Sequence, residues 1–145
     1  MSEPLRLRAE EAEDIAVLSA ALQDSVLQMG DLVYDAKARR FTATINRFRW
    51  ESAGANAPFE RVRAALAFEG VTGVRSARVR REDKDAVASL LSLAFAPDAE
   101  PPGGKVTIVL AGGGEIELSV ECVDAVLIDL GAPWPTPRKP SHEAA

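Results

Sequence analysis

Apolar and polar residues alternate most regularly between residues 105 and 121. The segment 105–111 is apolar at every second position, and the segment 115–121 repeats this pattern with glutamates in between. A period of two is typical of a half-buried antiparallel strand. Gly112–Gly114 separates the two segments and favours a tight turn. The pattern therefore predicts a β-hairpin over 105–121.

A second alternating segment begins at residue 40 and then changes phase. Its first apolar residues share one face of a strand: Phe41, Ala43 and Ile45. The next two aromatic residues, Phe48 and Trp50, have the opposite parity. A β-bulge at residues 46–47 would add one residue and return both rings to the core face. We therefore predict buried rings, with Arg47 and Arg49 in solvent.

Weaker alternation and turn-forming residues indicate further strands. Residues 32–34 precede residue 40 at hairpin spacing, and Gly30 interrupts the apolar run before them. Leu91, Leu93 and Phe95 alternate, although a helical turn competes at the start of their segment. The predicted strands are seven: 26–34, 40–50, 62–69, 74–80, 87–96, 105–111 and 115–121.

Helical spacing of apolar residues occurs near both ends of the chain. It predicts a helix over residues 10–23, with carboxylates crowding the first turn, where they oppose the helix dipole. Residues 122–130 fit a short C-terminal helix ending at Gly131, and continuation of a strand is the alternative. The charged run 78–83 is expected to be a strand edge or a loop.

These elements predict an α+β domain with a mostly antiparallel β-sheet or barrel of about seven strands. The strand order followed by a terminal helix is similar to that of a pleckstrin-homology-like barrel. Residues 1–131 are expected to form one globular domain, because a chain of 145 residues with 47% hydrophobic residues has the size and composition of a single domain. Residues 132–145 are a proline-rich tail.

The net charge of −5 conceals a segregation along the chain. Residues 1–36 carry eight acidic against two basic residues, and residues 85–145 carry nine against three. Residues 37–84 reverse this, with twelve basic against five acidic residues. Local neutralisation between neighbouring elements explains the pattern most simply, and a basic surface for an anionic partner is the alternative.

The basic middle segment interleaves arginines with aromatic residues. Sheet surfaces that bind single-stranded nucleic acid need exposed rings beside cations. Buried rings argue against that use, so nucleic-acid or other anion binding is the second hypothesis. Its candidate binding residues are Arg39, Arg40, Arg47, Arg49, Arg61 and Arg63.

Catalytic and metal-binding chemistry has little support in this sequence. One cysteine and one histidine, Cys122 and His142, cannot supply a structural zinc site. We expect Cys122 to be a buried, unreactive apolar residue and His142 to be a solvated tail residue. No cofactor and no metal site is expected, and an enzyme is the third hypothesis only.

The chain has neither a signal-peptide pattern nor an apolar run that could span a membrane, and its single cysteine suits a reducing compartment. We therefore expect a cytoplasmic protein that binds no membrane. A protein partner is the leading expectation, nucleic acid is second, and a homo-oligomer remains open.

Four sequence motifs carry a resemblance to a known family. They are Asn46–Glu51 (NRFRWE), Ala111–Ile116 (AGGGEI), Val120–Val123 (VECV) and Asp129–Trp134 (DLGAPW). They resemble an uncharacterised bacterial family, domain of unknown function 2948. The resemblance implies no activity, cofactor or catalytic residue. The leading hypothesis is therefore a non-enzymatic cytoplasmic protein-interaction domain.

Overall fold

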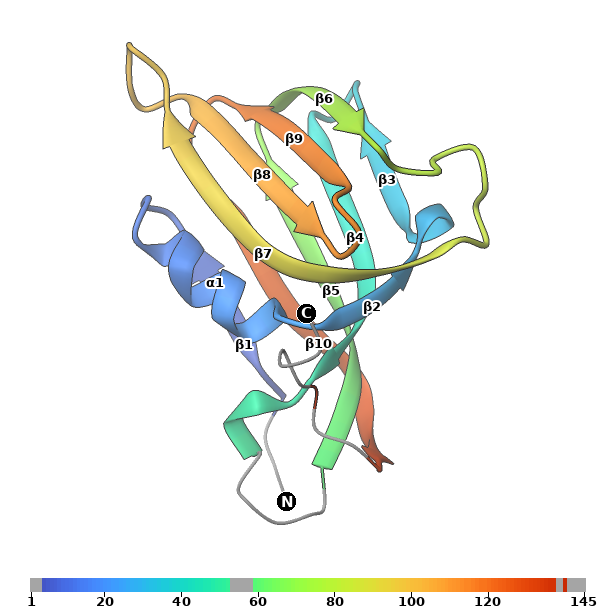
Figure 1. Ribbon diagram of the computed structural model, residues 1–145. Helices are drawn as coiled ribbons and strands as arrows, with labels where there is room; N and C mark the ends of the chain where they lie inside the picture. Colours follow the sequence, from blue (N-terminus) through green and yellow to red (C-terminus); the bar gives the residue numbers. More distant parts are fainter. Residues whose placement is uncertain (1–3, 53–58, 138–139, 141–145) are drawn as a thin grey trace.

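The computed structural model describes residues 4–52, 59–137 and 140 of the chain. Within these residues, ten strands form a single antiparallel sheet that carries one α-helix (Figure 1). The strands are β1 (Arg6–Ala9), β2 (Ser25–Gln28), β3 (Leu32–Asp35), β4 (Arg40–Phe48), β5 (Phe59–Glu69), β6 (Val71–Ala77), β7 (Val87–Pro97), β8 (Gly104–Leu110), β9 (Glu115–Val120) and β10 (Ala125–Thr136). The helices are α1 (Asp14–Leu22) and the short 3₁₀ segments η1 (Met29–Asp31) and η2 (Trp50–Ser52).

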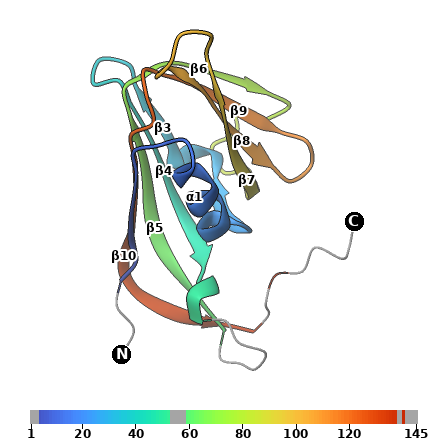
Figure 2. The same cartoon turned by 90° about the vertical axis from the view of Figure 1, so that its left-hand side faces the viewer.

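The sheet curls so that its two halves face each other. Its order is β1-β10-β5-β4-β2-β7-β8-β9-β6, and β3 pairs with β4 beside β2. We call β1, β10, β5, β4 and β3 the back wall, and β2, β7, β8, β9 and β6 the front wall. Figure 2 shows α1 between the two walls. The sheet stays open, because β3 and β6 are not paired with each other.

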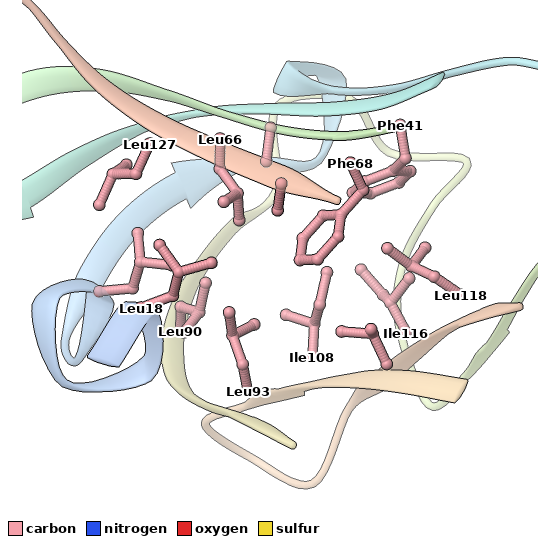
Figure 3. Packing of buried hydrophobic residues seen from close by; sticks show 14 of the residues in the cluster. Leu18, Phe41, Leu66, Phe68, Leu90, Leu93, Ile108, Ile116, Leu118 and Leu127 are labelled. Carbon is pink, nitrogen blue, oxygen red and sulfur yellow. The ribbon is translucent and has the colours of Figure 1, made fainter. Parts of the chain in front are cut away.

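The space between the walls holds the hydrophobic core. The back wall contributes Phe41, Leu66, Phe68 and Leu127, and the front wall contributes side chains such as Ile108 (Figure 3). Helix α1 adds Leu18, which points into the same cluster. Burial of this shared apolar surface is the main force that holds the two walls together.

Strand register places alternate residues of the back wall on the inner surface. One cross-strand row runs from Leu32 through Ala43, Leu66 and Leu127 to Leu7. Along each strand, the residues directly before and after this row point outward, as the period of two requires.

The predicted hairpin over 105–121 is confirmed. Strands β8 and β9 pair in register, with Ile108 opposite Ile116. Gly112 and Gly113 adopt positive φ in the turn, which glycine does without steric cost. The alternating residues expected inside are buried.

Other expected elements are present with shifted ends. The helix over 10–23 is shorter, and the strand over 26–34 is interrupted by η1, which contains Gly30. The segment 87–96 is a strand throughout, and 74–80 is replaced by β6, which ends at Ala77. The run 78–83 lies in the loop that joins β6 to β7.

The expected C-terminal helix is wrong, because residues 125–136 form strand β10. This strand pairs with β1 on one side and with β5 on the other. A closed barrel is also wrong, and the sheet has ten strands instead of seven. The terminal helix on which the pleckstrin-homology-like comparison depended is therefore absent from the described residues. The first part of the proposed tail, 132–136, continues β10.

The expected bulge at residues 46–47 is also wrong. Strands β4 and β5 pair without a register shift from Arg40 to Phe48. Phe48 is fully buried, as expected, but Trp50 lies in η2 and is only half-buried. Arg47 is 0% exposed and Arg49 3% exposed, so neither side chain faces solvent. Their carboxylate partners, described below, make this burial possible.

Candidate interaction site

The six candidate arginines lie at separate places along β4 and β5, and each has a polar partner. Arg39 and Arg40, near the start of β4, form exposed ion pairs with Glu121 and Glu69. Solvent screens exposed pairs of this kind, so they contribute little to folding stability. They neutralise charge between neighbouring strands, as the simpler reading of the charge pattern expected.

Arg47 is the centre of a buried ion network on the inner surface of the back wall. Its Nε donates to Asp129 Oδ1 at 2.7 Å, and its Nη2 donates to Asp129 Oδ2 at 2.9 Å. The same guanidinium donates to both carboxylate oxygens of Glu51. The Leu5 N–H also donates to Asp129, at 2.8 Å. The network therefore ties β4, η2, β10 and the residue preceding β1 together.

The charges in this network stabilise one another. Burial alone would lower the pKa of Arg47, but hydrogen bonds to Glu51 and Asp129 outweigh it, so the Arg47 pKa is raised. Burial would raise the pKa of Asp129, but hydrogen bonds from Arg47 and from the Leu5 N–H lower it below the ordinary value. The pKa of Glu51 is lowered against its burial by the same guanidinium.

The three remaining arginines are also engaged. Arg49 pairs with Glu60, and Arg63 lies 3.5 Å from an oxygen of Asp31. Arg61 donates to the carbonyl oxygen of Asp24 at 3.1 Å and to that of Asn46 at 3.2 Å. Burial lowers the pKa of Arg61 despite the opposing effect of Asp24. The structure thus gives each candidate arginine an intramolecular role, and anion binding by these residues remains a prediction.

A cleft opens where the sheet fails to close, between β3 of the back wall and β6 of the front wall. It has a volume of about 170 Å³. Its lining is Met29, Leu32, Tyr34, Phe41, Val74, Ser76, Val79, Arg81 and Ile116. Because the sheet is unclosed here, apolar core residues such as Phe41 reach its wall. We call this the seam cleft.

Two sets of hydrogen bonds fix the ends of the seam cleft. At one end, Tyr34 Oη donates to the Val71 carbonyl at 2.9 Å, and the Val71 N–H donates to the Arg39 carbonyl. At the other, the loop between β6 and β7 is held to η1, because the Gly30 N–H donates to the Lys84 carbonyl at 2.8 Å. The cleft is therefore bounded by fixed backbone.

The loop between β6 and β7 brings three arginines to the cleft. Arg78 is occupied, since it donates to the Gly113 carbonyl and lies 3.4 Å from Glu115. Arg81 lines the seam cleft, and Arg80 lines an adjoining hollow of about 180 Å³. Arg80 and Arg81 are exposed and form no ion pair within the described part of the chain. Two free cations thus stand beside an apolar opening.

Only weak signals for this cleft are present in the sequence. The run 78–83 was expected to be a charged edge or loop, and it contains Val79, the apolar residue that lines the cleft. Neither Arg80 nor Arg81 was among the candidate residues. Finding them required the relation between β3 and β6, which lie about forty residues apart and do not pair.

Two other candidate residues are placed differently from expectation or not at all. Cys122 is half-buried instead of buried, at the edge of a hollow lined also by Phe95 and Pro102. His142 lies outside the described residues. No group of three or more potential metal-ligating side chains occurs in 4–52, 59–137 and 140. No helix there is both long and apolar enough to cross a membrane.

Comparison with known proteins gives one family and no activity. A family model described as "Protein of unknown function (DUF2948)" matches residues 5–142. This match confirms the resemblance drawn from the sequence motifs. No curated protein and no solved structure matches the chain.

Proposed function

The chain belongs to this family of unknown function, and from its geometry we propose that it is a non-enzymatic, cytoplasmic protein-interaction domain that binds a short acidic peptide segment at the seam cleft. One observation carries the proposal: an apolar cleft lies beside the unpaired edge of β6, next to the free cations Arg80 and Arg81. The single cysteine supports a reducing compartment.

Strand β6 can accept an added strand because it is at the edge of the sheet. It pairs with β9 on one side and with no described strand on the other. Val74 and Ser76 of β6 line the cleft. In strand addition, backbone hydrogen bonds supply affinity, and pockets for alternate side chains supply specificity. A peptide along β6 would place every second side chain toward the cleft.

The size of the cleft defines the anchor residue of such a peptide. A cavity of about 150 Å³ lined by apolar side chains accepts a benzene ring. The seam cleft, at about 170 Å³, has room for one Phe or Leu side chain. Arg80 and Arg81 would then pair with acidic residues beside that anchor. Free arginines on the loop also disfavour the addition of basic strands, so the partner is acidic.

The proposal can be tested with a library of ten-residue peptides, each with one Phe or Leu flanked by two or three acidic residues. We expect selected peptides to bind with micromolar affinity, as measured by fluorescence anisotropy. Arg80→Glu combined with Arg81→Glu should weaken binding at least tenfold, because two attractive charges become repulsive. Ser76→Trp should weaken it by filling the cleft.

A matched control carries the same change of net charge elsewhere. Lys37→Glu combined with Lys105→Glu alters two cations, in the turn between β3 and β4 and on β8, that do not line the seam cleft. This control should bind peptide normally. If both double variants lose peptide affinity equally, the loss is due to net charge and not to the position of Arg80 and Arg81. Failure to select any acidic peptide would refute the proposal. Salt-sensitive binding of single-stranded RNA would instead support the second hypothesis.

A further inference from the structure

The outer surface of the back wall has the composition of a surface that is covered. Two cross-strand rows at its centre are Thr42, Ala67 and Val126, and Thr44, Ala65 and Ile128. We call these six residues the open face. No described element lies on this side of the wall in Figure 2. The six side chains of the open face are small or apolar and half-buried, and Val33 at the β3 edge of the wall is 56% exposed.

The strands of the open face have a sequence pattern that differs from one-sided strands. Residues 64–68 and 125–128 are continuous apolar runs, so both faces of β5 and β10 are apolar over these residues. Runs of this kind are typical of strands buried on both faces. On the front wall, by contrast, the outward positions of β9 are Glu115, Glu117 and Ser119.

We propose that a second copy of this chain covers the open face, so that the back walls of two molecules pack together as a symmetric dimer. This interface is separate from the seam cleft and independent of peptide binding. Contiguous exposed apolar surfaces in soluble proteins mark interaction sites. Most soluble oligomers are symmetric homodimers in which the same surface meets itself.

The charges at the two edges of the open face indicate which molecule covers it. At the β1 edge, Arg8 lies in the same row as Val126, and Arg6 lies in the next row, beside Ile128. At the β3 edge, Val33 lies in the same cross-strand row as Arg8. Asp35 lies in the next outward row along the strand.

Arg8 also forms exposed ion pairs with Glu10 at 3.0 Å and with Asp124 at 3.7 Å, and Asp35 lies opposite Arg40, which pairs with Glu69. Exposed pairs of this kind are weak, so a second copy can replace them. The outward charges of the two edge strands are thus opposite: basic on β1 and acidic on β3.

A two-fold axis parallel to the strands, placed over β5, makes these edges meet. Rotation about this axis places the β3 edge of one copy over the β1 edge of the other. Each cross-strand row keeps its position along the strand direction. Arg8 then lies about 7 Å along the strand from the partner copy's Asp35, within the reach of an arginine side chain. An axis perpendicular to the strands would place the β1 edges of the two copies over each other and so oppose arginine with arginine. Charge complementarity therefore favours the first arrangement, with Ala65 at the centre.

The area of the face predicts a weak dimer. Strands β1 and β3 have four residues each, so five strands about 4.8 Å apart, with about six residues of each central strand in contact, cover roughly 400 Å² per copy. The total of roughly 800 Å² is in the range of small, transient interfaces. We therefore expect a dissociation constant in the micromolar range and aligned packing of the two sheets.

Sedimentation equilibrium on the full chain between 1 and about 200 μM tests the proposal. The wild-type chain should dimerise, and Ala65→Arg should raise the dissociation constant at least a hundredfold, because it acts twice at the axis. Thr107→Arg, on the outward face of the front wall, is the matched control and should dimerise normally. A monomeric wild-type chain, or equal effects of both variants, would overturn the proposal.

A charge exchange tests the arrangement even if Ala65→Arg fails to fold. Arg8→Asp and Asp35→Arg should each weaken the homodimer about tenfold or more, because like charges then meet at both edges. Mixing the two variants restores opposite charges at both edges and should restore association. If the mixture associates no better than either variant alone, the proposed dimer is wrong.

Discussion

Strands β5 and β9 lie in opposite walls and bury similar residues: Leu66 and Phe68 on one, Ile116 and Leu118 on the other. The outward residues at the centre of each strand differ, because β5 presents Ala65 and Ala67 there, between Arg63 and Glu69, whereas β9 presents Glu115 and Glu117. The inner residues satisfy one shared core, so they are alike. The outer residues differ because each wall has different surroundings on its outer surface. In the proposed dimer these are solvent for the front wall and a second molecule for the back wall.

The back wall also differs in its inner surface. It carries a buried charge network, in which Arg47 and Asp129 are both almost fully buried. Two charges taken from water are a weak source of stability but fix one arrangement of the strands that hold them. The network lies where β10 leaves the regular register with β5, between Leu130 and Trp134. It anchors β10 at Asp129, directly before the point where regular pairing is interrupted.

The largest expected effect comes from breaking this network. Arg47→Met leaves Asp129 buried without its main partner, which should lower the free energy of unfolding by about 3–5 kcal/mol. Urea denaturation at pH 7 measures this. Arg39→Met removes an exposed ion pair with Glu121 and is the control, with a loss below about 1 kcal/mol. Equal losses would show that the network does not act as a buried pair.

Truncation of core residues should affect the two walls equally. Leu66→Ala on β5 and Leu118→Ala on β9 each remove a fully buried side chain from the same cluster. Each should lower the free energy of unfolding by about 2–5 kcal/mol. A much larger loss in one wall, measured by urea denaturation below the dimer dissociation constant, would mean that the walls do not share one cooperative core.

Acid should weaken the back wall through the same network. The pKa of Asp129 is lowered from its ordinary value of 3.8, and that of Glu51 from 4.5. The unfolded chain therefore binds these protons at higher pH than the folded chain does. Their contribution is fully present above the unfolded values and is lost as pH falls through the folded ones. The free energy of unfolding should fall more steeply below about pH 4.5 in the wild-type chain than in Asp129→Asn. Parallel pH profiles would contradict this.

The strands that were predicted most accurately from the sequence are those with one buried face and one solvent-exposed face. In β8 and β9 the alternation is unbroken, because solvent and core impose opposite demands on successive residues. In β10 the residues from Ala125 to Ile128 are all apolar, so no period of two exists and a helix fits as well. The same two-sided apolar composition that concealed this strand also identifies the open face.

The site residues were harder to predict for a related reason. Arginine is rarely buried, so Arg47 was expected in solvent and a bulge was introduced to place it there. Its partner Asp129 is 82 residues away, and only the pairing of β4, β5 and β10 brings them together. Arg80 and Arg81 were recognisable as charged, but the cleft beside them forms between unpaired strands. Local sequence carries no signal for such a relation.

The smallest expected effect would sharpen the difference between the two outer faces. Thr42→Val replaces a hydroxyl by a methyl group at the open face, where the proposed partner's β10 lies against it. Each newly buried methyl contributes about 0.8 kcal/mol, and the symmetric dimer gains two. The dissociation constant should therefore fall roughly tenfold, since about 1.4 kcal/mol is a factor of ten. Thr107→Val makes the same change on the front wall and should leave association unchanged. If Thr42→Val leaves the sedimentation profile unaltered while both variants fold normally, Thr42 does not lie in the interface, and the axis over β5 is misplaced.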